Sequence, residues 1–407
     1  MQDTSKFTSG QPFICQLLNY VPKDIFQKAV EDSKTNHYYK KMKAKEHFVF
    51  LLYGVLTRKG GLRDICKNFP LFGHKLMYWG IHLLPLKSTL ADANKKRNSD
   101  FFAKLYAGLY QHYRGKLQAC HGLPIGGEID PTKVEVFDST TITLFKEILK
   151  GTGRNSINGK KKGGIKAFCK VNLAEGVPDF VCMKAASTNE NTFLKVLNLA
   201  EGSIAVFDKG FNRYRYFDEW TKNNRYFVTR LKDNAKYKVI KENNTLKDPY
   251  ILNDQIIELS YVQDKITRTV QLRLITHKDP ENNQAIMFLT NLMDKKAITI
   301  KLIYKNRWMI EVLFKQMKQN FEVKYFFSDS ENGIRSQIWV ALILNLLFSV
   351  IHKAIKEAED FKTMVSVVAK NLTVYIDVIL YFTNTNQYVK LWHEEELKKV
   401  QPKLEYG

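Results

Sequence analysis

Two short stretches decide the fold: residues 133–144, KVEVFDSTTITL, and residues 203–211, SIAVFDKGF. Each is an apolar, β-branched run that reaches the same Val-Phe-Asp triplet and then meets turn-forming or polar residues, which predicts a strand. Between them, residues 165–173 and 179–187 are joined through AEGVP, which predicts strand, turn, strand, and residues 191–200 (NTFLKVLNLA) predict a helix. Strands and helices are therefore mixed, which indicates an α/β or α+β layered domain.

The pattern changes on both sides of this domain. Up to about residue 120 it is helical and basic, and residues 88–114 predict one helix with Ser88 as its N-cap. Residues 225–292 are rich in β-like segments, and helical spacing then returns. We therefore expect five segments, namely a helical region whose basic residues suit a polyanion such as DNA (1–125), the first part of the core (126–222), a β-rich insertion (223–296), the second part of the core (297–360) and a helical tail (361–407).

Composition limits the class of protein. The chain has 407 residues, 44% of them hydrophobic, and its 63 Lys and Arg against 41 Asp and Glu give a net charge of +22. Such a chain can fill a core, and its excess positive charge favours a polyanionic partner, usually nucleic acid. Five cysteines without a C-x-x-C pair indicate reduced thiols in a cytosol and no cysteine zinc site. The longest apolar run, residues 338–351, is shorter than the ~18 residues of a membrane span, so we expect a buried helix and no membrane partner.

The two Val-Phe-Asp triplets suggest a metal site. Alternate side chains of a strand share a face, so Asp138 should lie on the face of Val136, and Asp208 on the face of Val206. If the strands are neighbours, both carboxylates project at the same end of the sheet, where hard oxygen ligands suit Mg²⁺ or Mn²⁺. The alternative is that these aspartates only start turns.

A third acidic candidate lies in residues 303–321, IYKNRWMIEVLFKQMKQNF, which have apolar residues at helical spacing and no Gly or Pro. At ~100° per residue, Tyr304, Arg307, Glu311 and Lys318 fall within one ~60° stripe of a helix. Glu311 could ligate a metal, Arg307 and Lys318 could hold phosphate oxygens, and Tyr304 could pack on a sugar or base. The alternative is a solvated face with an ordinary i,i+4 ion pair.

The spacing of Tyr304, Arg307, Glu311 and Lys318 resembles the Y-R-E-K signature of DDE transposases of the insertion-sequence-four type. The segments Asp138-Ser139-Thr140 and Asp208-Lys209-Gly210-Phe211 resemble the first and second acidic motifs of that family, and the likeness covers roughly residues 8–350. It implies a ribonuclease H-like catalytic core interrupted by a β-rich insertion, with helical N-terminal and C-terminal regions.

The resemblance also implies a mechanism. Asp138, Asp208 and Glu311 would hold two Mg²⁺ ions, with Mn²⁺ as the other candidate metal, for cleavage at transposon ends and strand transfer into target DNA. Relatives often form a hairpin intermediate with a flipped base, on which Tyr304 and Trp308 could stack; Trp308 could equally be a core residue. The implied partners are terminal inverted repeats and target DNA, bound by a dimer in the bacterial cytoplasm.

A basic loop adds further candidates. Residues 150–166, KGTGRNSINGKKKGGIK, hold six basic residues and five glycines but fit no Walker register, so they favour a loop that follows a phosphate backbone over an ATPase. A merely solvated loop is the alternative. The candidates for DNA contact are therefore Tyr304, Arg307, Lys318, Trp308, Lys160, Lys161, Lys162, Lys166 and, in the strand expected to open the insertion, Arg230.

One position departs from the family pattern. Many relatives carry a histidine two residues after the lysine that corresponds to Lys166, whereas this chain has Phe168. The acidic triad is intact, but a phosphate or water contact made by that histidine would be missing. This leaves open a catalytically impaired or domesticated transposase that acts as a sequence-specific DNA-binding protein. A metal nuclease on the same kind of sheet, acting on RNA or RNA·DNA hybrids, is a second alternative.

Overall fold

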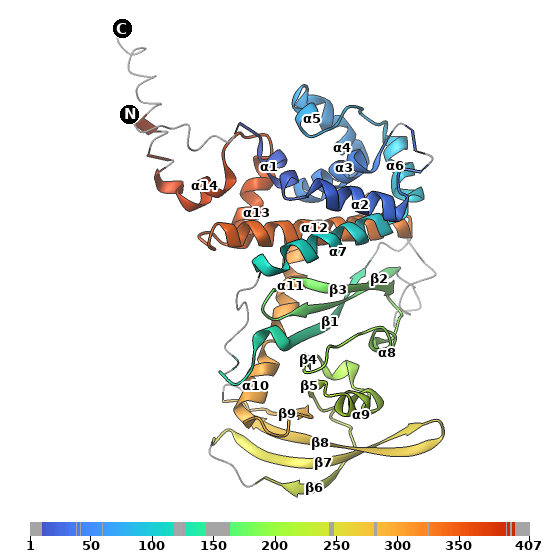
Figure 1. Ribbon diagram of the computed structural model, residues 1–407, viewed down its shortest axis with the longest axis vertical. Coiled ribbons are helices and arrows are strands. Elements are labelled where there is room, and N and C mark those ends of the chain that lie inside the picture. The colour runs from blue at the N-terminus through green and yellow to red at the C-terminus, as the bar shows by residue number, and fades with distance from the viewer. Residues whose placement is uncertain are drawn as a thin grey trace. The chain divides into compact units, whose positions relative to one another are not determined.

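The computed structural model describes residues 10–37, 39–40, 42–58, 60–117, 125, 127–143, 163–243, 248–280, 283–321, 323, 325–387, 389–390 and 393–394 (Figure 1). The chain divides into two compact units, Gln118–Lys315 and the combination of Met1–Leu117 with Gln316–Gly407. The boundary falls inside helix α11 (Trp308–Asn320). The first part of the expected core (126–222) and the expected insertion (223–296) lie in one unit, whereas the boundary at residue 315 divides the second part of the expected core (297–360). Lys160, Lys161 and Lys162 lie outside the described residues.

The unit Gln118–Lys315 is built on one mixed sheet. Its first five strands are β1 (Val134–Thr143), β2 (Gly164–Asn172), β3 (Pro178–Ala185), β4 (Ile204–Val206) and β5 (Tyr226–Arg230). They are ordered β3-β2-β1-β4-β5, with antiparallel pairing among β1, β2 and β3 and parallel pairing of β1 with β4 and of β4 with β5. This is the ribonuclease H-like arrangement, so the expected fold class is confirmed.

Four more strands extend the same sheet in the order β9-β8-β7-β6. They are β6 (Lys238–Glu242), β7 (Ile251–Gln263), β8 (Ile266–Lys278) and β9 (Ala285–Thr290), and Figure 1 shows β7 and β8 running side by side as the longest pair. β9 pairs antiparallel with β5, which itself lies beside β4. β5 therefore completes the core sheet, although the insertion was expected to begin before it, at residue 223.

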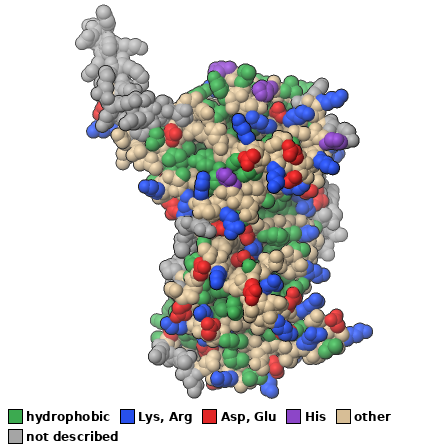
Figure 2. Space-filling view, viewed as in Figure 1, with side chains coloured by type: hydrophobic (Ala, Val, Ile, Leu, Met, Phe, Trp, Pro, Cys, Tyr) green, Lys and Arg blue, Asp and Glu red, His purple; other side chains and the backbone are tan. Residues whose placement is uncertain are grey.

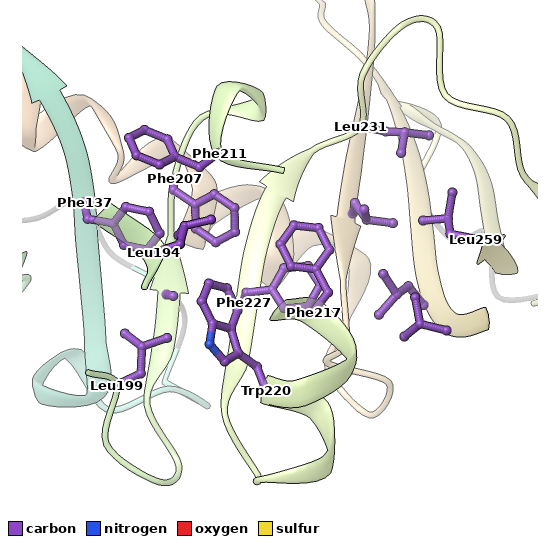
Figure 3. Close-up of a cluster of buried hydrophobic side chains, with 14 of the residues drawn as sticks. Phe137, Leu194, Leu199, Phe207, Phe211, Phe217, Trp220, Phe227, Leu231 and Leu259 are labelled. Carbon is purple, nitrogen blue, oxygen red and sulfur yellow. The ribbon is translucent and has the colours of Figure 1, made fainter. Parts of the chain in front are cut away.

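An aromatic cluster fills one face of the sheet and determines how the strands align (Figure 3). The short helices α8 (Glu190–Leu194) and α9 (Tyr214–Lys222) cover this face. The rings of Phe137 and Phe207 stack with centroids 4.7 Å apart, and Phe217 of α9 stacks on Phe227 of β5 at 4.2 Å. Because such a cluster fixes which residues point inward, the alternate residues, including Asp138 and Asp208, must point to the other face.

The expected single helix over residues 303–321 is interrupted. The chain forms α10 (Ala297–Lys305), a turn, and then α11. Asn306 is 2% exposed, and the turn closes through i to i−3 bonds from Arg307 N–H to Tyr304 C=O (3.0 Å) and from Met309 N–H to Asn306 C=O (3.0 Å). This local tightening replaces the regular α-helical ladder, so a stripe calculated for a continuous helix does not describe the side chains on both sides of Asn306.

The other unit is helical. Its helices are α1 (Phe13–Asn19), α2 (Lys23–Ser33), α3 (Ala44–Thr57), α4 (Leu62–Asn68), α5 (Lys75–Tyr78), α6 (Lys87–Lys96), α7 (Asp100–Leu117), α12 (Glu331–Ala354), α13 (Phe361–Lys370) and α14 (Val378–Thr383). The single helix expected over residues 88–114 is wrong, because α6 and α7 are separate and Ser88 lies inside α6. The N-cap of α6 is Leu86.

Helix α12 contains the longest apolar run and packs against α3, α6 and α7. Its N-cap is Ser330, whose hydroxyl accepts a hydrogen bond from the N–H of Gly333 at 3.1 Å. By length and composition this helix alone among the described residues could cross a membrane, but 83% of its apolar window is buried inside the protein. The expectation of a buried core helix is therefore confirmed.

Candidate active site

Three charged side chains follow the same register on three neighbouring strands. In β1, β4 and β5 the residues Val136, Val206 and Val228 are aligned as parallel partners. Two residues further along each chain stand Asp138, Asp208 and Arg230. Since side chains two apart share a face and parallel neighbours lie about 4.8 Å apart, these three groups converge at one end of the sheet. The two carboxylates that the Val-Phe-Asp triplets predicted are thus on adjacent strands.

Arg307 brings the third carboxylate to this place. Its guanidinium Nη1 lies 3.4 Å from Asp138 Oδ2, and its Nη2 lies 2.6 Å from Glu311 Oε1. One planar group therefore bridges an acid of the sheet and an acid of the helix, which are 173 residues apart in sequence (311 − 138). Side chains of Asp138, Arg307 and Glu311 are 19%, 18% and 33% exposed, so the centre is sheltered but reachable.

The electrostatics of Asp138 differ from those of a surface acid. The pKa of Asp138 is raised from 3.8 to about 6, chiefly by burial and to a smaller extent by the nearby charges of Asp208 and Glu311. The Ser139 N–H, which donates to Asp138 Oδ1 at 2.7 Å, and the guanidinium of Arg307 act in the opposite direction and lower this pKa. A carboxylate that is costly to ionise without a cation is well suited to bind one.

The neighbouring groups are oriented by local bonds. Asp208 is the N-cap of the turn Lys209–Phe211, and its Oδ2 accepts a hydrogen bond from the N–H of Gly210 at 3.1 Å. Burial alone would lower the pKa of Arg307, but the hydrogen bond to Glu311 and the surrounding anionic groups outweigh it and raise that pKa. Local bonds therefore hold both groups in place in the absence of a metal.

The donor set fits a hard divalent cation. Asp138, Asp208 and Glu311 offer carboxylate oxygens and no sulfur or imidazole, which is what Mg²⁺ and Mn²⁺ prefer. Across the part of the chain that the structure describes, no three His, Cys, Asp or Glu side chains are already gathered as a metal cage. At Asp138 and Glu311 the positive charge is supplied by Arg307. Binding of a metal would therefore require these side chains to rearrange around it.

The predicted nucleic-acid contacts near the centre have different surroundings. Trp308 is 62% exposed, so it is not a core residue, and it directly follows Arg307. Tyr304 packs its ring on Phe288 of β9 at 5.2 Å, and its buried hydroxyl is close to the charges of Arg307, Asp208 and Arg230. Tyr304 is thus a supporting residue of the centre, whereas Trp308 presents a free ring.

The two lysines predicted to contact DNA, Lys318 and Lys166, also have different surroundings. Lys318 lies two helical turns beyond Glu311 on α11 and belongs to the other unit. Lys166 is 4% exposed, and its Nζ binds Glu190 Oε1 at 2.8 Å and the carbonyl of Thr188 at 3.0 Å. A buried, paired ammonium does not present its charge to DNA, so we do not carry Lys166 forward as a DNA contact. Figure 2 shows the Lys and Arg side chains on the visible face spread among Asp and Glu.

Phe168 lies away from the carboxylates. It pairs across the strands with Ser139 and therefore shares the face of Phe137, on which the aromatic cluster is packed. The ring is fully buried and stacks on Phe193 with centroids 5.1 Å apart. A side chain at this position contacts the core of the unit, so the phenylalanine removes nothing from the face that holds Asp138.

One residue that supports the centre was missed in the sequence. Asn212 is 4% exposed, and its side chain donates to the carbonyl of Arg230 at 2.7 Å and accepts from the hydroxyl of Thr229 at 3.1 Å. It thereby joins the turn after Asp208 to the end of β5. Its signal was its place directly after Asp208-Lys209-Gly210-Phe211, where a buried polar side chain is needed to satisfy backbone groups.

Comparison with known proteins shows the family of the chain. Residues 129–347 match the family described as Transposase DDE domain, and residues 9–82 match a domain of unknown function, DUF4372. A transposase designated y4zB, from Sinorhizobium fredii, is 27% identical over 272 residues, which are 66% of this chain and 72% of the relative. A transposase of insertion sequence element IS4SA, from Synechocystis, is 24% identical over 269 residues, 65% of this chain and 71% of the relative.

A solved structure of the piggyBac transposase synaptic complex with hairpin DNA is 10% identical, with a TM-score of 0.44, and the match covers 93% of this chain and 82% of that one.

Proposed function

The chain belongs to the Transposase DDE domain family, and from that premise we propose that Asp138, Asp208 and Glu311 are its catalytic carboxylates. As a DDE transposase it catalyses DNA transposition, a process that divalent metal ions support throughout the family. The observation that carries the assignment is the bridge of Arg307 between Asp138 and Glu311, beside an Asp208 that follows the register of Asp138.

These three carboxylates would hold two Mg²⁺ ions, or Mn²⁺ in their place. When bound, such ions activate a water or a 3′-hydroxyl and stabilise the charge on the leaving oxygen. The raised pKa of Asp138 is consistent with this role, because burial and two neighbouring acids make its negative charge unfavourable unless a proton or a cation neutralises it. The N–H of Gly210 donates a hydrogen bond to one oxygen of Asp208 and so restricts the rotation of that carboxylate.

The remaining side chains would act on the DNA. The guanidinium of Arg307 is a planar fork that suits the non-bridging oxygens of the scissile phosphate, and Arg230 lies on the same face. Trp308 is exposed beside Arg307 and could stack on an unpaired base. Lys318, further along α11, would bind phosphate farther from the scissile bond.

The DNA would be the terminal inverted repeats of the mobile element and then the target duplex. Synapsis of two ends suggests that two copies of the chain act together on DNA in the bacterial cytoplasm. The binding-only alternative was based on Phe168. Because the ring of Phe168 packs in the aromatic cluster and not beside the carboxylates, its presence gives no reason to expect a loss of catalysis. A nuclease specific for RNA finds no support among the relatives, which are described as transposases.

The test is cleavage of DNA that carries the inverted repeats flanking the gene, in Mg²⁺ or Mn²⁺. We expect Asp138→Ala, Asp208→Ala and Glu311→Ala each to abolish nicking and strand transfer while DNA binding in EDTA persists. Glu219→Ala, which removes an exposed acid of α9 in the same unit, is the matched control and should cleave normally. A wild-type rate in any of the three variants would remove that residue from the proposal.

A further inference from the structure

A pocket of about 630 Å³ lies in the unit Gln118–Lys315, where the start of α9, the segment after β5 and the end of β7 meet. Five cationic side chains line it, and no Asp or Glu does. The cations come from three separate segments: Lys195, Arg213, Arg215, Lys232 and Lys236. A concave site whose charges share one sign concentrates ligands of the opposite sign. The pocket therefore selects an anion.

Three acids around this pocket already have cationic partners. Glu190 is bound by Lys166, Asp233 by Lys209, and Asp218, which accepts from the hydroxyl of Tyr261, by Lys222, each at 2.8 Å. Within the described ranges, none of the five cations of the pocket forms an ion pair with a carboxylate. Burial and the adjacent guanidinium of Arg213 lower the pKa of Lys232, and the more distant charge of Glu190 offsets this only in part. Positive charge is thus crowded here beyond what the neighbouring acid balances.

The backbone favours an anion at the same place. Helix α9 begins at Tyr214, its N-cap is Arg213, and no side chain caps its N-terminus. The first-turn N–H groups of a helix have no intrahelical acceptor and carry a partial positive charge. Together with the side-chain cations, they form a setting that suits phosphate oxygens.

The remaining walls are aromatic and held in place. Tyr214 packs on Phe217 with centroids 6.0 Å apart, and Tyr216 packs on Trp220 at 6.3 Å. The hydroxyl of Tyr261, from β7, donates to Asp218 at 2.5 Å. Cations interleaved with fixed aromatic rings are typical of surfaces that follow single-stranded nucleic acid, because every base offers a face for stacking. The volume falls in the range of roughly 300–1,000 Å³ found for ligand sites, enough for one or two nucleotides.

The pocket adjoins the candidate active site. Asn212, one of its lining residues, binds the carbonyl of Arg230 at the end of β5. Arg213 follows Asp208 by five residues, and Lys232 follows Arg230 by two. We propose that this pocket binds the phosphodiester backbone of the DNA strand that leaves the carboxylate centre, with its tyrosines stacking on one or two unpaired bases. This inference rests on the proposed function, since it needs DNA at that centre.

The experiment measures binding of a fluorescein-labelled duplex of the element end with a short single-stranded extension, in EDTA, as a function of salt. The slope of log affinity against log salt is negative, and each phosphate contact contributes about 0.7–0.9 to its magnitude. The double variant R213Q/K232Q should therefore reduce the magnitude of this slope by roughly 1.5. The matched control is K238Q/K241Q, which removes two exposed lysines of β6 outside the pocket and should leave the slope at the wild-type value. R213K/K232R keeps both charges and should also retain it.

If the pocket variant and the β6 variant reduce the salt dependence of DNA binding equally, the proposal is overturned, because the effect would then reflect only general attraction between lysines or arginines and DNA. The proposal would also be overturned by a pocket variant that keeps its DNA slope but loses affinity for a mononucleotide such as dTMP, which would indicate a small-molecule site. Because these measurements exclude metal, they are independent of cleavage. A protein that cleaves normally with an unchanged slope refutes the pocket alone, and one that shows the slope change but never cleaves refutes the proposed function alone.

Discussion

Replacement of Asp138 by Asn should stabilise the protein while abolishing its metal-dependent chemistry. The pKa of Asp138 is raised from 3.8 to about 6, chiefly by burial. Each pKa unit corresponds to about 1.4 kcal/mol, so the ionised carboxylate costs the folded state up to about 3 kcal/mol. Asn keeps an oxygen for the N–H of Ser139 but loses the contact with Arg307. We therefore expect a net gain of about 1–2 kcal/mol.

The size of this effect depends on pH. Since the pKa is higher in the folded state, the folded wild-type protein holds more protons than the unfolded chain between about pH 4 and 6. Wild-type stability from this group is therefore fully present below pH 4 and is lost as the pH rises through 6. Asp138→Asn cannot titrate, so it should match the wild type near pH 4 and exceed it at pH 8.

Thermal unfolding followed by fluorescence at both pH values measures this difference. At about 2–4 °C per kcal/mol for a unit of this size, the melting temperature of Asp138→Asn should exceed that of the wild type by about 2–8 °C at pH 8. The matched control is Asp254→Asn, because the bidentate bond from Arg273 (2.6 and 2.9 Å) more than offsets burial and lowers the pKa of Asp254. The free energy of unfolding of Asp254→Asn should be about 3–5 kcal/mol lower than that of the wild type. If Asp138→Asn melts below the wild type at pH 8, Asp138 is a structural ion-pair residue and our reasoning fails.

Two further predictions concern the same face and the opposite one. The affinity for Mn²⁺, measured by calorimetry, should fall about tenfold per pH unit below 6, because the proton and the metal compete for Asp138; an affinity that stays level from pH 7 to 5 would exclude Asp138 as a ligand. Phe168→His should lower stability by about 2 kcal/mol or more without raising the cleavage rate, since it places a polar ring without a partner against Phe193. Phe168→Leu is its control, and faster cleavage by the His variant would show that position 168 reaches the scissile phosphate.

The sheet was predictable because its signal is local. The alternation in residues 133–144 and 203–211 places Phe137 and Phe207 on one face and both aspartates on the other, and the structure confirms this register. The buried helix α12 was predictable for a similar reason, since its apolar run is too long to leave in water. Patterns that repeat every two residues or every turn need no knowledge of the partner element.

The features that escaped prediction depend on the burial and the partners of single side chains, which a local pattern does not reveal. The break between α10 and α11 has no Gly or Pro, and it arises where Asn306 is buried and bonds back to the carbonyl of Leu302 at 2.9 Å. Lys166 was expected to contact DNA because its neighbours are basic, yet Glu190 and Thr188 enclose its ammonium. The stretch Asn212-Arg213-Tyr214-Arg215-Tyr216 interleaves cations with aromatic residues. The sequence does not reveal that these residues line a pocket, which becomes visible only in the structure.

The long separation between Asp208 and Glu311 acquires a physical reason from the strands between them. Arg273 of β8 donates through Nη1 to the carbonyls of Leu292 and Met293, at 3.2 Å each, and to that of Lys295, in the segment that leads into α10. Helix α10 is bound again where the ammonium of Lys301 donates to His277 Nε2 of β8 at 2.7 Å.

These bonds fix α10 to the sheet before the turn at Asn306 presents Arg307. A guanidinium that binds two acids at once must be positioned to within a few tenths of an ångström. The segment that leads to it must therefore be held rigidly. The inserted strands therefore do more than lengthen the chain: by holding α10 they determine where Arg307 meets Asp138 of the sheet and Glu311 of the helix.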